Sequence, residues 1–321
     1  MKAFVHDRYG SPDVLELREI PKPEATEDRV LVRVLASSVN AHDWHMLRGK
    51  PYLARLGGGL RRPTSTVQGL DVAGVVEDIG PDVTDLRPGD AVFGSRLGAF
   101  AEYVSGRNFV PIPGGLTFEQ AAAIPTAGFT ALQALRDKGH VQPGQRVLVN
   151  GAGGGVGSVA VQLAKAFGAE VTAVTSSDNL EMVRSLGADQ VIDYARDDFT
   201  RAGHRYDLIL DPGASRPLLS MRRALAPDGT LVLIGPGAGN WIGPLVRIAG
   251  AVLVSRVSKQ TMRAFLADVS REDLLLLKEL IEAGKLRPVV DRTYPFEEIP
   301  EAVRYLESGR ASGKVVISVP T

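Results

Sequence analysis

The stretch Arg146-Val-Leu-Val-Asn150, followed by Gly151-Ala-Gly-Gly-Gly-Val-Gly157, decides the fold of this 321-residue chain. A short apolar run ends in a cluster of glycines, and apolar residues then recur at helical spacing at Val159, Leu163 and Phe167. The pattern predicts a strand, a glycine turn and an amphipathic helix. At such a turn free N–H groups and the helix dipole favour a phosphate, and glycines let it approach the backbone. We therefore expect a dinucleotide to bind here.

The glycine spacing departs from the strict pattern Gly-x-Gly-x-x-Gly, because residue 156 is Val. Two variant spacings fit, one through Gly151, Gly154 and Gly157 and one through Ala152, Gly154 and Gly157. The alternative is a flexible glycine turn without a ligand, and the flanking strand and helix patterns disfavour it.

Downstream of this turn, apolar runs alternate with helical periods as far as Gly235. Parallel neighbouring strands need long connections, which helices supply, so the alternation predicts an α/β domain with a parallel sheet. The expected strands are Val147–Val149, Val171–Val174, Val191–Ile192, Leu208–Leu210 and Leu231–Ile234.

The first third of the chain has a different texture, with short β-branched runs separated by turn residues. These runs are Val30–Leu35, Ala73–Asp78, Ala91–Phe93 and Ala101–Val104. They indicate an antiparallel or barrel-like domain.

The end of the chain is expected to return to this first domain. Ser270 and Asp273 resemble a helix cap, a helix ends at Gly284, a short amphipathic helix starts near Phe296, and Val315–Val319 reads as a last strand. We therefore predict a β-rich domain over 1–122, completed by 287–321, and a dinucleotide-binding domain over 123–286. A cleft between two domains is a natural ligand site.

Composition narrows the possible functions. Thirty-seven basic residues balance thirty-seven acidic ones, so no net field draws in nucleic acid or a membrane surface, and we expect a small-molecule partner. The chain has no cysteine, which excludes disulfides, a thiol nucleophile, iron–sulfur clusters and thiolate zinc sites. Lys2, His6, Asp7 and Arg8 stand where a signal peptide needs an apolar run, so we expect a cytoplasmic protein.

The end of the second strand predicts which dinucleotide binds. An acidic side chain there would bind the ribose 2′-hydroxyl of NADH and repel the 2′-phosphate of NADPH. Glu170 begins that strand, whereas the strand ends at Thr175-Ser176-Ser177, whose hydroxyls suit a phosphate. We therefore favour NADPH over NADH. Asp178 counts against this choice unless it turns outward as the N-cap of the next helix.

Several segments, in this order, carry a resemblance to a known family: Val39–Asp43, Gly69–Val76, Pro125–Ala131, the glycine turn, Leu186–Asp189 with Val191–Tyr194, and Gly313–Val316. Over nearly its whole length the chain resembles the medium-chain dehydrogenase/reductase superfamily. Within it, the chain is similar to the zinc-independent quinone oxidoreductase branch, near the reticulon-interacting-protein type.

The resemblance implies a GroES-like β domain and a Rossmann-type, doubly wound domain, with NADPH between them. It also implies cofactor contacts at positions that match the family. These are Gly154, Gly155 and Val156 for the pyrophosphate, Ser176 and Tyr194 for the 2′-phosphate, Thr130 and Gly235 for the nicotinamide, and Gly313 and Lys314 from the tail. The glycine spacing and the strand end add Gly151, Gly157 and Ser177 to the expected cofactor residues. Ser312 stands where relatives often have Arg, so the phosphate or substrate contact of that arginine is not expected here. The family further implies a homodimer formed through the edge of the Rossmann sheet.

Zinc is not expected. The zinc-dependent branch would have Gly-His-Glu where this chain has Gly69-Leu70-Asp71, and Cys where it has Asn40. His42 and His45 are three residues apart with no second cluster of ligands, so their pattern is typical of a cleft or surface and not of a metal site.

Without a Lewis acid, reduction of an electrophilic acceptor is easier than oxidation of an alcohol. We hypothesise hydride transfer from NADPH to a quinone or to the β-carbon of an enone. Asn40 and Tyr52 are candidates to hydrogen-bond the developing oxyanion, and Asp43 to hold the local loop. Asn40 as a turn residue, and Tyr52 as a lid or core aromatic, are equal alternatives. Two other functions stay open: a regulatory protein that binds NADPH without turnover, and a zinc-free alcohol or aldehyde dehydrogenase.

Two further stretches are candidates for the mouth of the ligand site. The glycine-rich segment Tyr52–Thr66 reads as a mobile lid, with Arg61 and Arg62 more typical of a solvated face than of a substrate contact. The apolar stretch Trp241–Val254 is predicted either to wall the acceptor pocket or to form a subunit contact.

Overall fold

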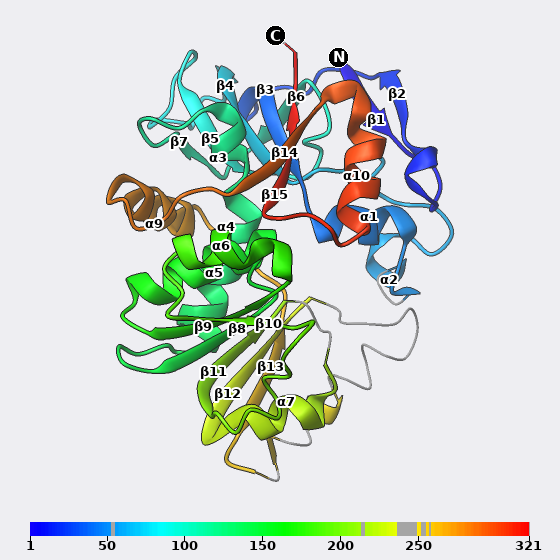
Figure 1. Cartoon of the computed structure of the whole chain (residues 1–321). Coiled ribbons are helices and arrows are strands. Elements are labelled where there is room, and N and C mark those ends of the chain that lie inside the picture. The colour runs from blue at the N-terminus through cyan, green and yellow to red at the C-terminus, as the bar shows by residue number, and fades with distance from the viewer. Residues whose placement is uncertain (53–54, 213–215, 236–248, 252–254, 257, 321) are drawn as a thin grey trace. The chain divides into compact units, whose positions relative to one another are not determined.

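The computed structural model describes residues 1–52, 55–212, 216–235, 249–251, 255–256 and 258–320. The chain divides into two units, one formed by Met1–Thr126 with Val269–Thr321 and the other by Ala127–Asp268. The second segment of unit 1 begins earlier than position 287, where the sequence predicts it. The reason is helix α9 (Arg271–Glu282), which packs against strand β7 (Phe109–Pro111) of unit 1 (Figure 1).

Unit 1 is built on a seven-stranded sheet of order β14-β15-β3-β4-β5-β7, in which β6 also pairs with β3. The strands are β3 (Val30–Val39), β4 (Asp71–Ile79), β5 (Ala91–Ser95), β6 (Tyr103–Gly106), β7, β14 (Val290–Pro295) and β15 (Lys314–Ser318). All pairs are antiparallel except β14 with β15. Three predicted strands fall inside β3, β4 and β5, while the fourth is displaced by two residues onto β6. A separate two-stranded sheet joins β1 (Lys2–Val5) to β2 (Glu16–Glu19).

The core of unit 1 is aromatic and aliphatic. Phe4 and Phe296 meet edge to face, with ring centroids 5.5 Å apart, an arrangement that aromatic pairs prefer. Helix α10 (Ile299–Glu307) buries Ile299 and Val303 in the same core, which confirms the short amphipathic helix expected from the sequence. The Ser270 hydroxyl accepts a hydrogen bond from the Asp273 N–H at 3.2 Å, so the predicted cap of α9 is also present.

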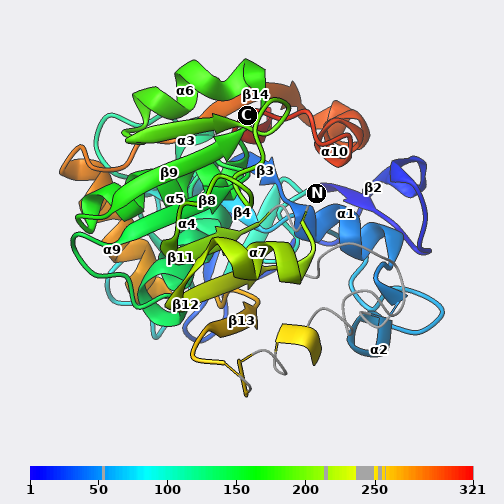
Figure 2. The same ribbon diagram turned by 60° about the horizontal axis from the view of Figure 1, so that its bottom comes forward.

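Unit 2 is a parallel six-stranded sheet of order β10-β9-β8-β11-β12-β13, and Figure 2 shows β9, β8, β11, β12 and β13 in this succession. The strands are β8 (Arg146–Asn150), β9 (Glu170–Thr175), β10 (Gln190–Asp193), β11 (Tyr206–Asp211), β12 (Leu225–Ile234) and β13 (Thr261–Phe265). The strand order reverses between β8 and β11. The predicted doubly wound sheet is therefore confirmed.

Helices connect the strands of this sheet. α5 (Gly155–Ala166) packs on β8 and β9, α6 (Leu180–Ser185) on β9 and β10, and α7 (Leu218–Ala224) on β12. Since the chain winds away from β8 in both directions, the point between β8 and β11 is a topological switch point. In such sheets a ligand binds at the carboxyl ends of the strands beside that point.

Short helices complete the chain. They are α1 (Ala41–Arg48), α2 (Arg55–Gly58), α3 (Phe118–Ala122) and α4 (Pro125–Gln133), the last continued by one π-helical turn, Ala134–Lys138. None of the helices in the described ranges has the length and apolar character needed to cross a membrane. The apolar stretch Trp241–Val254 lies almost entirely outside the described residues.

Candidate functional site

The glycine turn of unit 2 is fixed onto the neighbouring strand. The N–H groups of Gly151 and Ala152 both donate to the Val174 carbonyl of β9 at 2.9 Å. A Cβ atom on residue 157 would lie only 2.1 Å from the Gly151 carbonyl oxygen, so the close approach of α5 to the turn requires glycine there.

The same turn leaves the first N–H groups of α5 outside the helical ladder. Gly154 is the N-cap, and the Ser158 N–H makes the first helical hydrogen bond to the Gly154 carbonyl at 2.9 Å. The N–H groups that precede this bond belong to Gly155, Val156 and Gly157. At a helix N-terminus such groups, together with the helix dipole, form an anion site. The turn therefore fits the pyrophosphate of a dinucleotide.

Two serines follow β9, and the structure distinguishes them. The Ser177 hydroxyl donates to Asp193 Oδ2 at 2.6 Å, so its hydrogen is engaged. The Ser176 oxygen accepts from Asn179 Nδ2 at 3.1 Å, which leaves its own hydrogen available. Tyr194, also expected near the 2′-phosphate, is 54% exposed beside this strand end. Ser176 is therefore better disposed than Ser177 to donate to a phosphate.

Two carboxylates lie near the same strand end. Asp178 is exposed, but it is not the N-cap of α6; that position belongs to Asn179, because Asp178 lies inside a 3-10 turn. Asp193 was not singled out by the sequence. Its hydrogen bonds from the Ser177 hydroxyl and the Ala195 N–H hold the pKa of its carboxyl below the usual range. Its position at the end of a predicted strand is the signal that identifies it.

In unit 1, Asp43 joins the start of α1 to a distant glycine. Its carboxylate accepts from the Asn40 N–H at 2.7 Å and from the Gly69 N–H at 3.2 Å. Asp43 is buried, and burial raises the pKa of its carboxyl to about 7 despite these two bonds. These contacts are what a residue that holds the local loop would make.

Asp71 is the centre of the polar contacts in unit 1. It is fully buried at the start of β4. Its Oδ2 accepts from Ser38 Oγ at 2.6 Å, Asn40 Nδ2 at 3.0 Å and Lys314 Nζ at 3.0 Å. Its Oδ1 accepts from the Thr126 N–H at 2.8 Å and the Thr126 hydroxyl at 2.6 Å. We call Ser38, Asn40, Asp71, Thr126 and Lys314 the Asp71 network.

The ammonium of Lys314 is saturated within this network. It donates to Asn40 Oδ1 at 2.5 Å and to Asp71 Oδ2, and the Val39 carbonyl lies 3.5 Å away. The amide of Asn40 is saturated too, because its two hydrogens go to Asp71 and to the Ser38 carbonyl at 3.3 Å. In this arrangement neither side chain has a hydrogen directed at a ligand. Both cross-link strand ends.

Tyr52 lies in a different environment from Asn40. The guanidinium of Arg55 stands 4.8 Å from the Tyr52 ring centroid and 4.3 Å from that of Tyr9, and its Nε donates to the Gly49 carbonyl at 3.0 Å. The Tyr9 hydroxyl donates to the Gly58 carbonyl at 2.8 Å. The start of the predicted lid is thus tied down by cation–π contacts and hydrogen bonds. Residues 53 and 54 lie outside the described part.

The remaining predicted cofactor residues are placed as follows. Thr130 is buried in α4. Gly235 follows β12 with φ of 80°, at the same sheet edge as Gly151. Gly313 has φ of 103°, and a Cβ there would lie 2.5 Å from the Val289 carbonyl oxygen, so backbone packing alone requires glycine at this position.

At the described positions that match the zinc site of the zinc-dependent branch, the side chains have other partners or no donor atom. Among the residues that the structure describes, no group of three or more histidines and carboxylates is arranged to hold a metal. Where the zinc-dependent branch has Cys, His and Glu, this chain has Asn40, Leu70 and Asp71. Leu70 has no donor atom for a metal, and Asn40 and Asp71 both bind the ammonium of Lys314. His45 is engaged elsewhere, with Nδ1 3.0 Å from the Lys50 carbonyl.

Two family profiles match the chain. The alcohol dehydrogenase GroES-like domain matches residues 26–128, and the zinc-binding dehydrogenase profile matches residues 186–317. Zinc appears in the description of the second family, whereas in this chain Asn40 and Asp71 are bonded to Lys314.

Among curated relatives, the 2-methylene-furan-3-one reductase of Solanum lycopersicum is 35% identical over 99% of this chain and 79% of its own length. The NADPH-dependent alkenal/one oxidoreductase of Arabidopsis thaliana chloroplasts is also 35% identical, with the same coverage. Among solved structures, the quinone oxidoreductase of Coxiella burnetii superposes with a TM-score of 0.88 at 31% identity, over 100% of this chain and 99% of its own.

Proposed function

Because this chain belongs to the medium-chain dehydrogenase/reductase superfamily, in its quinone-oxidoreductase-like branch, we propose that it transfers hydride from NADPH to a quinone or an α,β-unsaturated carbonyl compound. Its named relatives are oxidoreductases that act on such acceptors. The observation that carries the proposal is the glycine turn of unit 2, where Gly157 and the free N–H groups of α5 form a cradle for a pyrophosphate.

Bound NADPH supplies the hydride. The N–H groups of Gly155, Val156 and Gly157 would bind its pyrophosphate, and the available hydrogen of the Ser176 hydroxyl would bind the 2′-phosphate. The choice of NADPH over NADH is supported by the engagement of Asp193, whose carboxylate is bound by Ser177 and has Arg196 Nε at 3.5 Å. A carboxylate with these partners repels a phosphate less than a free one does.

Unit 1 contributes positioning. The Asp71 network and Asp43 hold the ends of β3, β4 and β15 and the start of α1 in one arrangement. We assign the hydrogen bond to the developing oxyanion to the Tyr52 hydroxyl, because the amide hydrogens of Asn40 are already used. Bound NADPH would supply hydride to the β-carbon of the enone, the Tyr52 hydroxyl would hydrogen-bond the resulting enolate oxygen, and solvent would supply the proton that completes the reduction.

Zinc-independent turnover is part of this proposal. A divalent cation between Asn40 and Asp71 would have to displace the Lys314 ammonium, which already neutralises the Asp71 carboxylate. We therefore expect a chelator to leave activity unchanged, and metal analysis of the active enzyme to find less zinc than protein. The proposal would be contradicted if the active enzyme contained one zinc ion per chain and lost its activity when a chelator removed that zinc.

Steady-state and stopped-flow oxidation of NADPH, with NADH in parallel, tests the function. The acceptors are a quinone, an enone and an aldehyde, with no metal added. We expect turnover of the quinone or the enone with NADPH preferred. Turnover of the aldehyde alone would indicate a zinc-free alcohol dehydrogenase. Tight NADPH binding without any turnover would indicate a regulatory binding protein, a second candidate that the saturated amide of Asn40 favours.

A homodimer through strand β13 is the expected assembly. β13 is the terminal strand of its sheet, and Leu266, directly after it, is 77% exposed. Unpaired strand edges readily pair with another copy. Size-exclusion chromatography with light scattering tests this, and Leu266→Lys is expected to shift a dimer toward monomer. We retain the cytoplasm as the expected compartment, which cell fractionation tests.

A further inference from the structure

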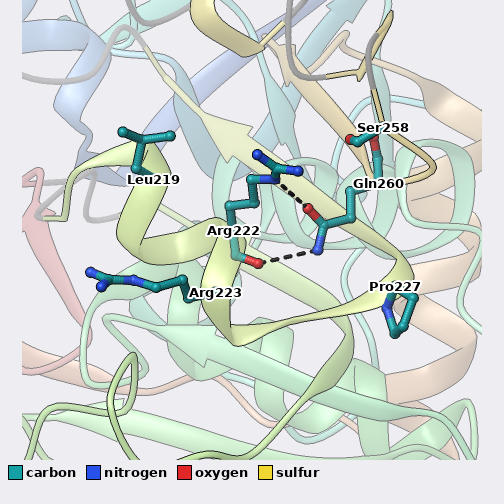
Figure 3. Close-up of a pocket in the computed structure, with 6 residues that line it drawn as sticks. All are labelled: Leu219, Arg222, Arg223, Pro227, Ser258 and Gln260. Atoms are coloured by element: carbon teal, nitrogen blue, oxygen red, sulfur yellow. Dashed lines mark hydrogen bonds between the residues drawn. The ribbon is translucent and has the colours of Figure 1, made fainter.

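We propose that unit 2 carries a second small-molecule site, which binds an oxyanion attached to a small apolar body. The site is a pocket of about 610 Å³ (Figure 3). Its lining residues are Leu219, Arg222, Arg223, Pro227, Ser258 and Gln260.

This pocket lies away from the glycine turn. It is formed by α7, by Pro227 near the start of β12, and by Ser258 and Gln260 directly before β13. These residues mark the amino-terminal edge of the parallel sheet, whereas Gly151 follows the carboxyl end of β8. A ligand of this pocket therefore does not compete with the dinucleotide.

Gln260 orients the first arginine. It is only 9% exposed. Its Nε2 donates to the carbonyls of Arg222 and Ala226, both at 3.1 Å, which satisfies acceptors left open where α7 ends. Its Oε1 accepts from Arg222 Nε at 3.0 Å. Figure 3 shows this reciprocal pair of bonds between Arg222 and Gln260. A buried amide thus fixes the plane of the guanidinium.

The outer edge of that guanidinium is unused. No residue of the described chain bonds to Arg222 Nη1 or Nη2. Arg223 adds a second cation, whose Nη2 donates to the Ser220 hydroxyl at 3.2 Å, and no carboxylate is among the lining residues. The planar pair of Nη groups matches two oxygens of a carboxylate or a phosphate, and holding the group in advance reduces the entropy lost on binding.

The remaining walls are apolar. Leu219 is 68% exposed, and in Figure 3 Leu219 and Pro227 lie on opposite sides of the Arg222–Gln260 pair. Burying an exposed leucine against a ligand is favourable, so the ligand should carry an apolar group beside its charge. A phosphate monoester or a carboxylate on a small ring fits this description.

Isothermal titration calorimetry with phenyl phosphate, benzoate and inorganic phosphate tests the proposal. We expect phenyl phosphate or benzoate to bind the wild type, and the better of the two to identify the anion. The double variant Arg222→Gln, Arg223→Gln should bind about ten-fold or more weakly, since charged hydrogen bonds are lost. Arg222→Lys should lose a similar factor, because lysine keeps the charge but not the oriented fork.

The matched control is Arg184→Gln with Arg201→Gln, which removes two exposed arginines of the same unit that pair with Glu181 and Asp198. It should bind like the wild type. Binding that survives in the Arg222, Arg223 double variant, or wild-type affinity in Arg222→Lys, would overturn the proposal, as would an absence of binding at millimolar probe. Inorganic phosphate as strong as phenyl phosphate would overturn the apolar part. Circular dichroism and NADPH titration check that each variant is folded.

Discussion

The Asp71 network of unit 1 and the glycine turn of unit 2 use polar groups in opposite ways. In the network every hydrogen of the Asn40 amide is used inside the protein, and Asp71 accepts five hydrogen bonds. At the glycine turn, the first N–H groups of α5 and the Ser176 hydrogen remain available. A network whose hydrogens are used inside the protein fixes its residues in place, whereas a turn with available donors can bind a ligand. We therefore expect substitutions in the network to lower stability and substitutions at the turn to lower NADPH affinity.

The largest effect is expected from Lys314→Met, which removes the buried ammonium that pairs with Asp71. An uncompensated carboxylate would remain buried, and breaking a buried pair in this way costs about 3–5 kcal/mol. Urea denaturation should show this loss in the free energy of unfolding. NADPH affinity, measured on the folded fraction at low temperature, should change far less.

Lys278→Met is the control for this prediction, because Lys278 pairs with Glu282 on the surface of α9. Exposed pairs of this kind contribute about 0.3–0.5 kcal/mol. The double variant Lys314→Met, Asp71→Asn should recover part of the loss, since it removes both charges. If Lys314→Met and Lys278→Met were equally stable, the pair of Lys314 and Asp71 would contribute no more than a surface ion pair.

The glycine turn can be predicted from the sequence, whereas the Asp71 network cannot. The glycine turn is local: strand, glycines and helix lie within about twenty residues, so period and spacing were enough to find it. Short β-branched runs also predicted the strands β3, β4 and β5. It did not assign α9 to unit 1, because an amphipathic helix shows that it has a packing partner but does not show which one.

The Asp71 network was not predicted, because its members are far apart in the chain. Asn40 and Lys314 are separated by 274 residues, and Asp71 lies 31 residues from Asn40. A signal was nevertheless present: a charged residue begins each of the apolar strands β4 and β15. Charged residues in such strands are buried only when paired, so two of opposite sign indicate a contact.

Gly157→Ala should have the next largest effect. Its Cβ would lie 2.1 Å from the Gly151 carbonyl oxygen, so the turn must shift and the N–H cradle is lost. We expect NADPH affinity to fall about a hundred-fold, equivalent to about 2.7 kcal/mol. Fluorescence titration of NADPH measures this.

Gly154→Ala separates the effect of the ligand from that of packing. A Cβ there would lie 3.6 Å from the nearest atom, an ordinary contact, so thermal stability should be unchanged. If the pyrophosphate approaches this residue, NADPH affinity should still fall. Gly114→Ala, where a Cβ meets nothing within 4 Å, should change neither quantity. Unchanged NADPH affinity in both Gly154→Ala and Gly157→Ala would place the cofactor elsewhere.

A smaller effect is expected from the titration of Asp43. Burial raises the pKa of its carboxyl from 3.8 to about 7 in the folded state, so folding favours the protonated form. The stability it contributes is therefore present at low pH and is lost as the pH rises through about 7. We expect the free energy of unfolding to be about 1.4 kcal/mol lower at pH 8 than at pH 6 from this group.

Asp43→Asn isolates that contribution. Burial lowers the pKa of His6, His42 and His45, so these residues change stability in the opposite sense, and only the difference between wild type and variant is informative. Urea denaturation between pH 5 and 8 should show that difference shrinking as the pH rises. A constant difference would mean that Asp43 does not titrate in this range.

The smallest effect distinguishes two neighbouring serines at the open edge. The Ser176 hydroxyl keeps a hydrogen for a 2′-phosphate, whereas the Ser177 hydrogen is donated to Asp193. Loss of one hydrogen bond to a charged group is worth about 1.5–3 kcal/mol and less than that where the group is solvated, so Ser176→Ala should raise KM for NADPH by about four-fold. NADH lacks the phosphate, and its KM should not change.

Ser177→Ala should leave the KM for NADPH within about two-fold of wild type or raise it slightly, because Asp193 then loses a donor and repels the phosphate more. The reverse ranking, with Ser177 the more important, would mean that Ser177 leaves Asp193 when the cofactor binds, and that this edge rearranges on binding.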